Sequence, residues 1–170
     1  MKTVQDSIKN AIDEENIFTL QHLNQLDSLL KQKITLWVDL DSQNKVHLTF
    51  IQYAIKQNKP KSLQYLLDHS LSINIPTEEF FNERYDYENP NLIFFALHFQ
   101  SNKCLEILIT FFKDKIENFD KITDSFGESP LSRAIKTKNE DAIKILLTLG
   151  NFDLLYFDQN KCSLSTFTPL

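Results

Sequence analysis

The chain has 170 residues, 42% of them hydrophobic and 24% charged, which is typical of one globular domain or one short repeat array. Only two glycines occur, Gly127 and Gly150, so a glycine-rich phosphate loop is excluded, and with it the usual dinucleotide and P-loop folds. The net charge of -5 gives no electrostatic reason to expect nucleic acid or anionic lipid as a partner.

Four segments with the same apolar pattern follow one another along the chain. Each contains an alanine (Ala11, Ala54, Ala96 or Ala134), and the spacings between them are 43, 42 and 38 residues. An apolar residue follows each alanine by nine positions and a leucine by twelve, which is one face of a helix. We therefore expect two helices per segment, with the small alanine allowing close packing of the first. The apolar residues are Leu20, Leu63, Leu105 and Ile143, then Leu23, Leu66, Leu108 and Leu146.

Helix-end signals support this division. Thr49 and Ser129 stand where a helix-capping side chain is needed, and Pro130 stands in a first helical turn, where its missing N–H costs nothing. The turn between paired helices often needs a left-handed residue. Asn16 and Asn58 are predicted to fill that position, because asparagine adopts this conformation more easily than most residues.

The segments resemble the ankyrin repeat. The last copy fits best, with Asp124-Ser-Phe-Gly127-Glu-Ser-Pro130-Leu131, then Ala134-Ile135, Leu146-Leu147 and Gly150. The resemblance covers roughly residues 5 to 155, although the spacings exceed the family's ~33 residues and most of its consensus glycines are absent.

The resemblance implies an all-α, ankyrin-like helical repeat solenoid that forms a single domain over residues 1–170. Four repeats are expected, with a partial repeat or cap at the C-terminal end. Their approximate ranges are 5–40, 41–75, 86–120 and 124–157, with an insert at 76–88 and the cap at 158–170.

The same resemblance implies a noncatalytic adaptor or scaffold that binds a protein partner through the concave surface of the stack. That surface is formed by turn fingers and by the exposed face of the first helices. The predicted contact residues are Lys45, Lys56, Tyr85, Tyr87, Glu88, Phe99, Phe126 and Glu128, and the fingers also include Val46, Leu48, Pro90 and Ser125.

Two points about the aromatic residues stay open. Aromatic side chains dominate binding hot spots, so Tyr87, Phe99 and Phe126 are candidate anchors, but apolar rings also pack between repeats. The insert at 76–88 could contact a partner through Tyr85 or Tyr87, or could be purely structural. The acidic run at 13–15 is expected to be a solvated turn.

Two other functions compete with the adaptor. The chain could be a permanent accessory subunit of a larger complex in an AT-rich protist, in which the fourteen phenylalanines would cover a buried interface. The AT-rich genome is inferred from sixteen lysines against two arginines, because lysine codons are AT-rich. The chain could also be a pathogen or viral ankyrin effector.

Neither catalysis nor a cofactor is expected. The four histidines have no metal-ligand spacing with either cysteine, and Cys104 is expected to be a buried, inert thiol. Two widely spaced cysteines and the absence of a signal-peptide pattern favour a cytoplasmic location. No apolar run reaches the ~20 residues that span a bilayer.

Overall fold

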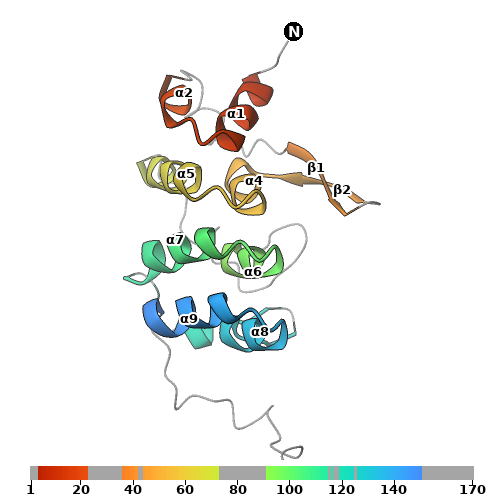
Figure 1. The fold of residues 1–170 in the computed structure, drawn as a ribbon, viewed down its shortest axis with the longest axis vertical. Coiled ribbons are helices and arrows are strands. Elements are labelled where there is room, and N and C mark those ends of the chain that lie inside the picture. Colours follow the sequence, from red (N-terminus) through yellow and green to blue (C-terminus); the bar gives the residue numbers. More distant parts are fainter. Residues whose placement is uncertain are drawn as a thin grey trace, which may run out of the picture.

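A computed structural model of the protein describes residues 4–22, 36–41, 44–72, 91–114, 116, 119–124 and 126–150. These ranges contain eight α-helices, one pair of β-strands and a short 3₁₀ turn, η2 (Phe119–Lys121). The helices form four consecutive pairs (Figure 1). The pairs are α1 (Val4–Asp13) with α2 (Ile17–His22), α4 (Phe50–Lys56) with α5 (Pro60–Ser72), α6 (Leu92–His98) with α7 (Asn102–Phe112), and α8 (Pro130–Lys136) with α9 (Glu140–Leu149).

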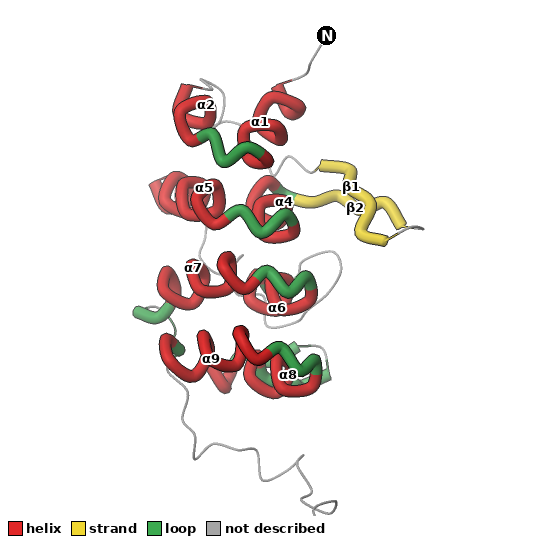
Figure 2. The backbone as a smooth tube through the Cα atoms, in the orientation of Figure 1, coloured by secondary structure: helices red, strands yellow, loops and turns green. Residues whose placement is uncertain are grey.

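The helix pairs stack in two layers along the long axis of the molecule. The first helices contact one another in the order α1, α4, α6, α8, and the second helices in the order α2, α5, α7, α9 (Figures 1 and 2). Each helix also contacts its own partner within the pair. The prediction of a helical stack of paired neighbours is therefore confirmed.

A β-hairpin precedes α4 and was not predicted. Strands β1 (Leu36–Asp41) and β2 (Asn44–Leu48) pair antiparallel, with Trp37 opposite His47 and an irregularity between Asp39 and Asp41. The hairpin projects from the first-helix layer, on the side away from α5 (Figure 1). The sequence pattern that could have predicted this hairpin is the partial alternation of apolar and polar residues in 36–48 on both sides of a polar turn.

The turn inside each helix pair is closed in the same way. Four residues after each alanine comes a residue with positive φ, between 51° and 54°: Glu15, Asn58, Gln100 and Lys138. Its N–H donates to the carbonyl three residues earlier, and the next N–H donates to the alanine carbonyl at 2.8–3.0 Å. These two bonds define a Schellman motif. The repeat register read from the alanines is thus reproduced in the backbone.

One of the two left-handed assignments was wrong. Asn58 has φ 51°, as predicted, but in the first turn the residue with positive φ is Glu15 rather than Asn16. The geometry closes four positions after the alanine, whereas Asn16 lies five after Ala11. Asn16 instead accepts a hydrogen bond from the Thr19 N–H at 3.0 Å, which caps α2.

The predicted helix caps are confirmed. The Thr49 side chain accepts from the Gln52 N–H, and the Gln52 side chain accepts from the Thr49 N–H, which is a complete capping box. The Ser129 hydroxyl accepts from the Ser132 N–H at 3.2 Å, and Pro130 lies in the first turn of α8. Each cap satisfies a backbone donor that the helix itself leaves unpaired.

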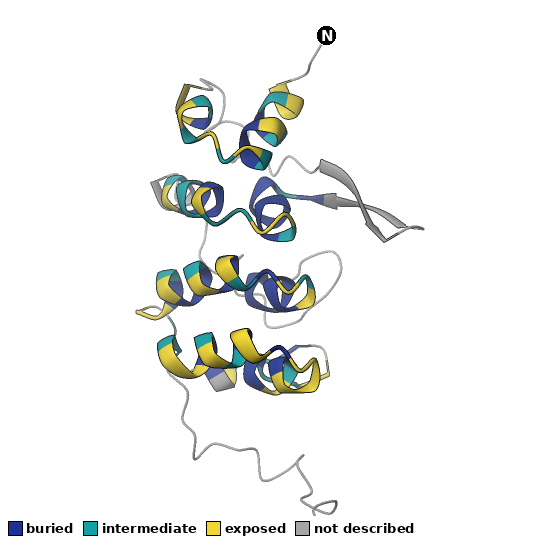
Figure 3. Ribbon diagram, in the orientation of Figure 1, coloured by how far each residue is buried: buried dark blue, intermediate teal, exposed yellow. Residues whose placement is uncertain are grey.

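The core lies between the two layers and between successive pairs. Ala11 is 3% exposed, and Ala54, Ala96 and Ala134 are 0% exposed, so the stacked first helices approach closely at these positions. Helices α4 and α6 are dark blue over most of their surface in Figure 3, because they have neighbours on both sides. Burying one leucine side chain stabilises the fold by about 1.5–3 kcal/mol. The predicted leucines within the described residues are all fully buried, and Ile143 is half-buried. Leu23 lies outside the described residues.

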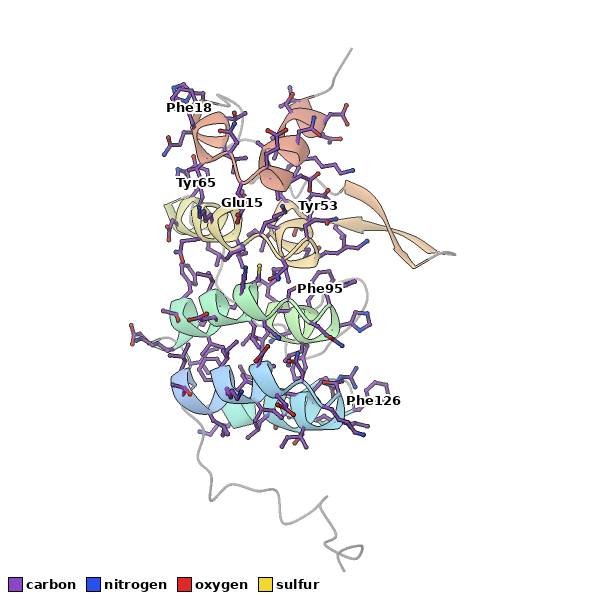
Figure 4. The ribbon with its side chains drawn as sticks, viewed as in Figure 1. Glu15, Phe18, Tyr53, Tyr65, Phe95 and Phe126 are labelled. Carbon is purple, nitrogen blue, oxygen red and sulfur yellow. The ribbon has the colours of Figure 1, made fainter. Side chains whose placement is uncertain are left out.

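The acidic run was predicted to be a solvated turn, and this is wrong for two of its three residues. The Tyr53 hydroxyl donates to both Asp13 carboxylate oxygens, at 2.8 and 3.0 Å, and the Lys59 ammonium donates to the Asp13 carbonyl. The Lys61 N–H donates to the Glu15 carboxylate at 3.0 Å. These bonds join the first helix pair to the second (Figure 4).

Similar polar contacts join the later pairs. The buried Ser101 hydroxyl donates to the Ile55 carbonyl at 2.6 Å. Asn102 and Asn139 exchange two side-chain hydrogen bonds, at 3.0 and 2.9 Å. The relative position of each pair is therefore fixed by hydrogen bonds as well as by apolar packing.

Candidate protein-interaction surface

The turn before α8 holds Phe126 outward. The Asp124 side chain, which is almost fully buried, accepts hydrogen bonds from the N–H groups of Phe126 and Glu128, both at 2.9 Å. Backbone bonds from Asp124 to Glu128 and from Gly127 to Asp124, each 3.0 Å, close the same turn. The φ of 75° at Gly127 is readily available to glycine. The Phe126 side chain, 71% exposed, therefore stands on a turn with a fixed backbone.

The carboxylate of Glu128 is bound by two basic side chains from α8. The Lys136 ammonium donates to one oxygen at 2.6 Å, and the Arg133 guanidinium donates to the other at 3.3 Å. The hydrogen bond from Lys136 is the main reason that the pKa of Glu128 is lowered. The same Arg133 atom lies 3.8 Å from the second carboxylate oxygen of Asp124. The turn carrying Phe126 is thus tied to the helix that follows it.

Phe99, which directly follows α6, contacts two other aromatic rings and one lysine side chain. Its ring lies 4.8 Å from the buried Phe95 ring and 4.8 Å from the His98 ring. The Lys56 ammonium, from the preceding first helix, lies 5.9 Å above the Phe99 ring centroid. This cation–π geometry joins α4 to α6 at the surface. Phe99 is half-buried, so part of its ring serves packing.

His98, the last residue of α6, is close enough to Arg133 of α8 to be affected by its charge. Its pKa is lowered, first because partial burial disfavours the charged ring, and second because the Arg133 charge is near. At the ends of α4 and α6, Phe99 thus contacts Lys56 and His98, and around α8, Glu128 contacts Arg133 and Lys136. We group these side chains with the exposed Phe126 as the first-helix edge, whose members are Lys56, His98, Phe99, Phe126, Glu128, Arg133 and Lys136.

The described structure places four of the eight predicted contact residues on the first-helix edge: Lys56, Phe99, Phe126 and Glu128. Lys45 lies in β2, and the structure describes only its backbone. Tyr85, Tyr87 and Glu88 lie outside the described residues, as do the insert at 76–88, Pro90, Ser125 and the cap at 158–170.

One predicted finger residue is not at the surface. Leu48 is only 2% exposed, because it ends β2 directly before α4 and belongs to the core cluster. Arg133 and Asp124 were not predicted as site residues, although both organise the Phe126 turn. An aspartate three residues before a glycine is a turn signal that could have identified Asp124.

A second exposed aromatic residue lies in the other layer. Phe18 on α2 is 70% exposed, and its ring lies 4.0 Å from the His22 ring one turn later. In Figure 4, Phe18 and Phe126 are labelled at opposite sides of the stack. The two residues match in type and exposure but differ in the surface they occupy.

Cys104 was predicted to be a buried thiol, and this is confirmed. Its side chain is 0% exposed, and burial raises the pKa of the thiol to about 12. Within the described ranges, no group of three or more histidine, cysteine, aspartate or glutamate residues is placed to hold a metal ion. No helix in those ranges is long and apolar enough to cross a bilayer.

Comparison with known proteins identifies no relative: no family model, no curated protein and no solved structure matches this chain.

Proposed function

We propose that this protein is a noncatalytic recognition module of the ankyrin-like type, which binds a protein partner through the first-helix edge. The observation that supports this most is the Phe126 turn. A large aromatic side chain is exposed on a backbone that Asp124 fixes by two hydrogen bonds of 2.9 Å. Such a residue contributes contact area without losing much conformational freedom on binding.

The surroundings of Phe126 fit the same proposal. Charges of both signs follow Phe126 in the turn and in α8, where Glu128 pairs with Lys136 and Arg133. In the two preceding helix pairs, the Lys56 ammonium lies over the Phe99 ring. An apolar centre with a polar, charged rim is the usual composition of a protein–protein interface. The ankyrin-like pattern of the sequence points to the same edge.

The permanent accessory subunit remains the alternative. It is favoured by the large hydrophobic residues that the described surface exposes at separate places, which an obligate interface would cover. These residues are Val4, Phe18, Phe126, Ile135 and Leu147.

A pair of matched variants tests the proposal. The tagged protein, Phe126→Ala and Phe18→Ala would each be used to capture partners from the native cells, followed by affinity measurement with the purified partner. Because the two residues are 71% and 70% exposed, both variants should fold equally well. We expect Phe126→Ala to weaken binding by at least about thirtyfold, equivalent to a hot spot of about 2 kcal/mol. Equal binding by Phe126→Ala, or selective loss in Phe18→Ala, would place the partner elsewhere.

A further inference from the structure

Among the described residues, the last helix pair, α8 with α9, exposes positions that the earlier pairs bury. One residue after the repeat alanine, Ile12 and Ile55 are 0% and Leu97 is 1% exposed, but Ile135 is 48% exposed. Thirteen residues after the alanine, Leu67 and Ile109 are 0% exposed, but Leu147 is 47% exposed. Each of the earlier pairs is followed in the stack by another pair, which contacts it.

The outer side of α8 and α9 is therefore an open stacking surface, which we define by Ile135 and Leu147. Terminal units of a repeat array normally have a polar outer side, because no further unit covers them. Here two large aliphatic side chains from different helices remain half-exposed on that side. Figure 3 shows more yellow on α8 and α9 than on α4 and α6.

We propose that residues 151–157 of this chain cover the open stacking surface. Their sequence is Asn-Phe-Asp-Leu-Leu-Tyr-Phe, in which five of the seven residues are apolar or aromatic. They follow directly after Gly150, which ends α9 three positions beyond Leu147. A short apolar segment thus begins at the border of an uncovered apolar surface.

The reach of the segment fits this role. Gly150 has φ -81° and ψ 147°, so the chain leaves α9 in an extended direction. Seven extended residues span up to about 24 Å, whereas packed helix axes are separated by about 8–10 Å. The segment can therefore extend from Leu147 on α9 across to Ile135 on α8.

An intramolecular cover also has an entropic advantage over a second copy of the chain. A directly tethered segment acts at a high effective concentration, about millimolar for a short flexible linker. A second copy would lose translational and rotational freedom on association.

Hydrogen exchange on the full chain tests this proposal, using Leu147→Asp and the matched control Thr148→Asp. Thr148 is the exposed neighbour of Leu147 on α9. In the wild type and in Thr148→Asp, the amides of 152–157 should exchange at least about tenfold more slowly than in an unstructured chain. In Leu147→Asp this protection should disappear.

A second variant keeps the test decisive if Leu147→Asp destabilises α9 itself. Leu155→Asp leaves both helices unchanged, and it should expose the surface and increase the binding of a hydrophobic dye. Three results would overturn the proposal: unprotected amides at 152–157 in the wild type, unchanged dye binding in Leu155→Asp, or protection that sedimentation traces to a dimer.

Discussion

Replacing Lys138 with glycine should stabilise the protein, which is the opposite of the usual effect of glycine in a helical fold. Lys138 has φ 54° in the turn between α8 and α9, and its side chain is exposed. The left-handed conformation costs a residue with a Cβ roughly 1–2 kcal/mol. Glycine avoids this cost but loses about 0.5–1 kcal/mol through the larger entropy of its unfolded chain.

The expected net stabilisation is therefore about 0.5–1 kcal/mol. For a chain of this size, it corresponds to an increase of about 1–4 °C in the melting temperature. Thermal unfolding followed by circular dichroism measures it. The backbone bonds of the turn are retained, because glycine keeps the N–H that donates to the Ile135 carbonyl at 3.0 Å.

Lys144→Gly is the matched control, since Lys144 is an exposed lysine inside α9. Glycine in a helix interior costs about 1 kcal/mol, so this variant should melt at a lower temperature. The two substitutions are chemically identical, and the reasoning requires them to have opposite signs. A decrease in melting temperature for both variants would refute the assignment of a left-handed turn at Lys138, and with it the shared register of the four turns.

Two further predictions concern titratable groups. In a Cys162→Ser background, Cys104 should resist a thiol reagent at pH 8 in the native protein and react on unfolding, because burial raises its pKa to about 12; rapid native labelling would contradict its burial. The lowered pKa of Glu128 means that its ionised form stabilises the fold. This contribution is complete above the usual glutamate pKa of about 4.3 and is lost as the pH falls through the lower folded value. Glu128→Gln should therefore lower the melting temperature at pH 7, and the difference from the wild type should shrink in acid. Glu106→Gln, on the exposed side of α7, controls for the loss of one carboxylate, and an equal effect in both variants would argue against the Lys136 contact.

Local features of the fold were predictable from the sequence wherever one residue type has a conformational role of its own. Thr49 and Ser129 cap helices because their hydroxyls satisfy a free N–H, and Pro130 tolerates the first turn. The repeat alanines identified the register, because only a small side chain suits the close contact between first helices.

Other features depend on contacts that sequence patterns do not contain. Asp13 and Tyr53 are forty residues apart, and only the stacking of two helix pairs brings them to 2.8 Å. The acidic run was therefore misread as a solvated turn. The error at Asn16 has a different cause, since the preference of asparagine for the left-handed region is weaker than the geometric requirement of the Schellman turn at Glu15.

The candidate surface was predictable only in part. Phe126 and Glu128 were predicted from their position in a repeat, but Arg133 and Asp124 act through side-chain geometry that a repeat pattern does not specify. Leu48 was misplaced, because the same pattern cannot distinguish a finger from a strand that runs into the core.

The proposed recognition function is tested most directly by capture of partners from native cells, first at low salt and then at about 0.5 M salt, where charges more than a few ångströms apart are screened. The account predicts one or two substoichiometric partners that are bound by the wild type and by Phe18→Ala, are lost in Phe126→Ala, and dissociate in high salt. A stoichiometric set of subunits that survives the salt and is retained by Phe126→Ala would contradict it and would identify the protein as a permanent component of a larger assembly.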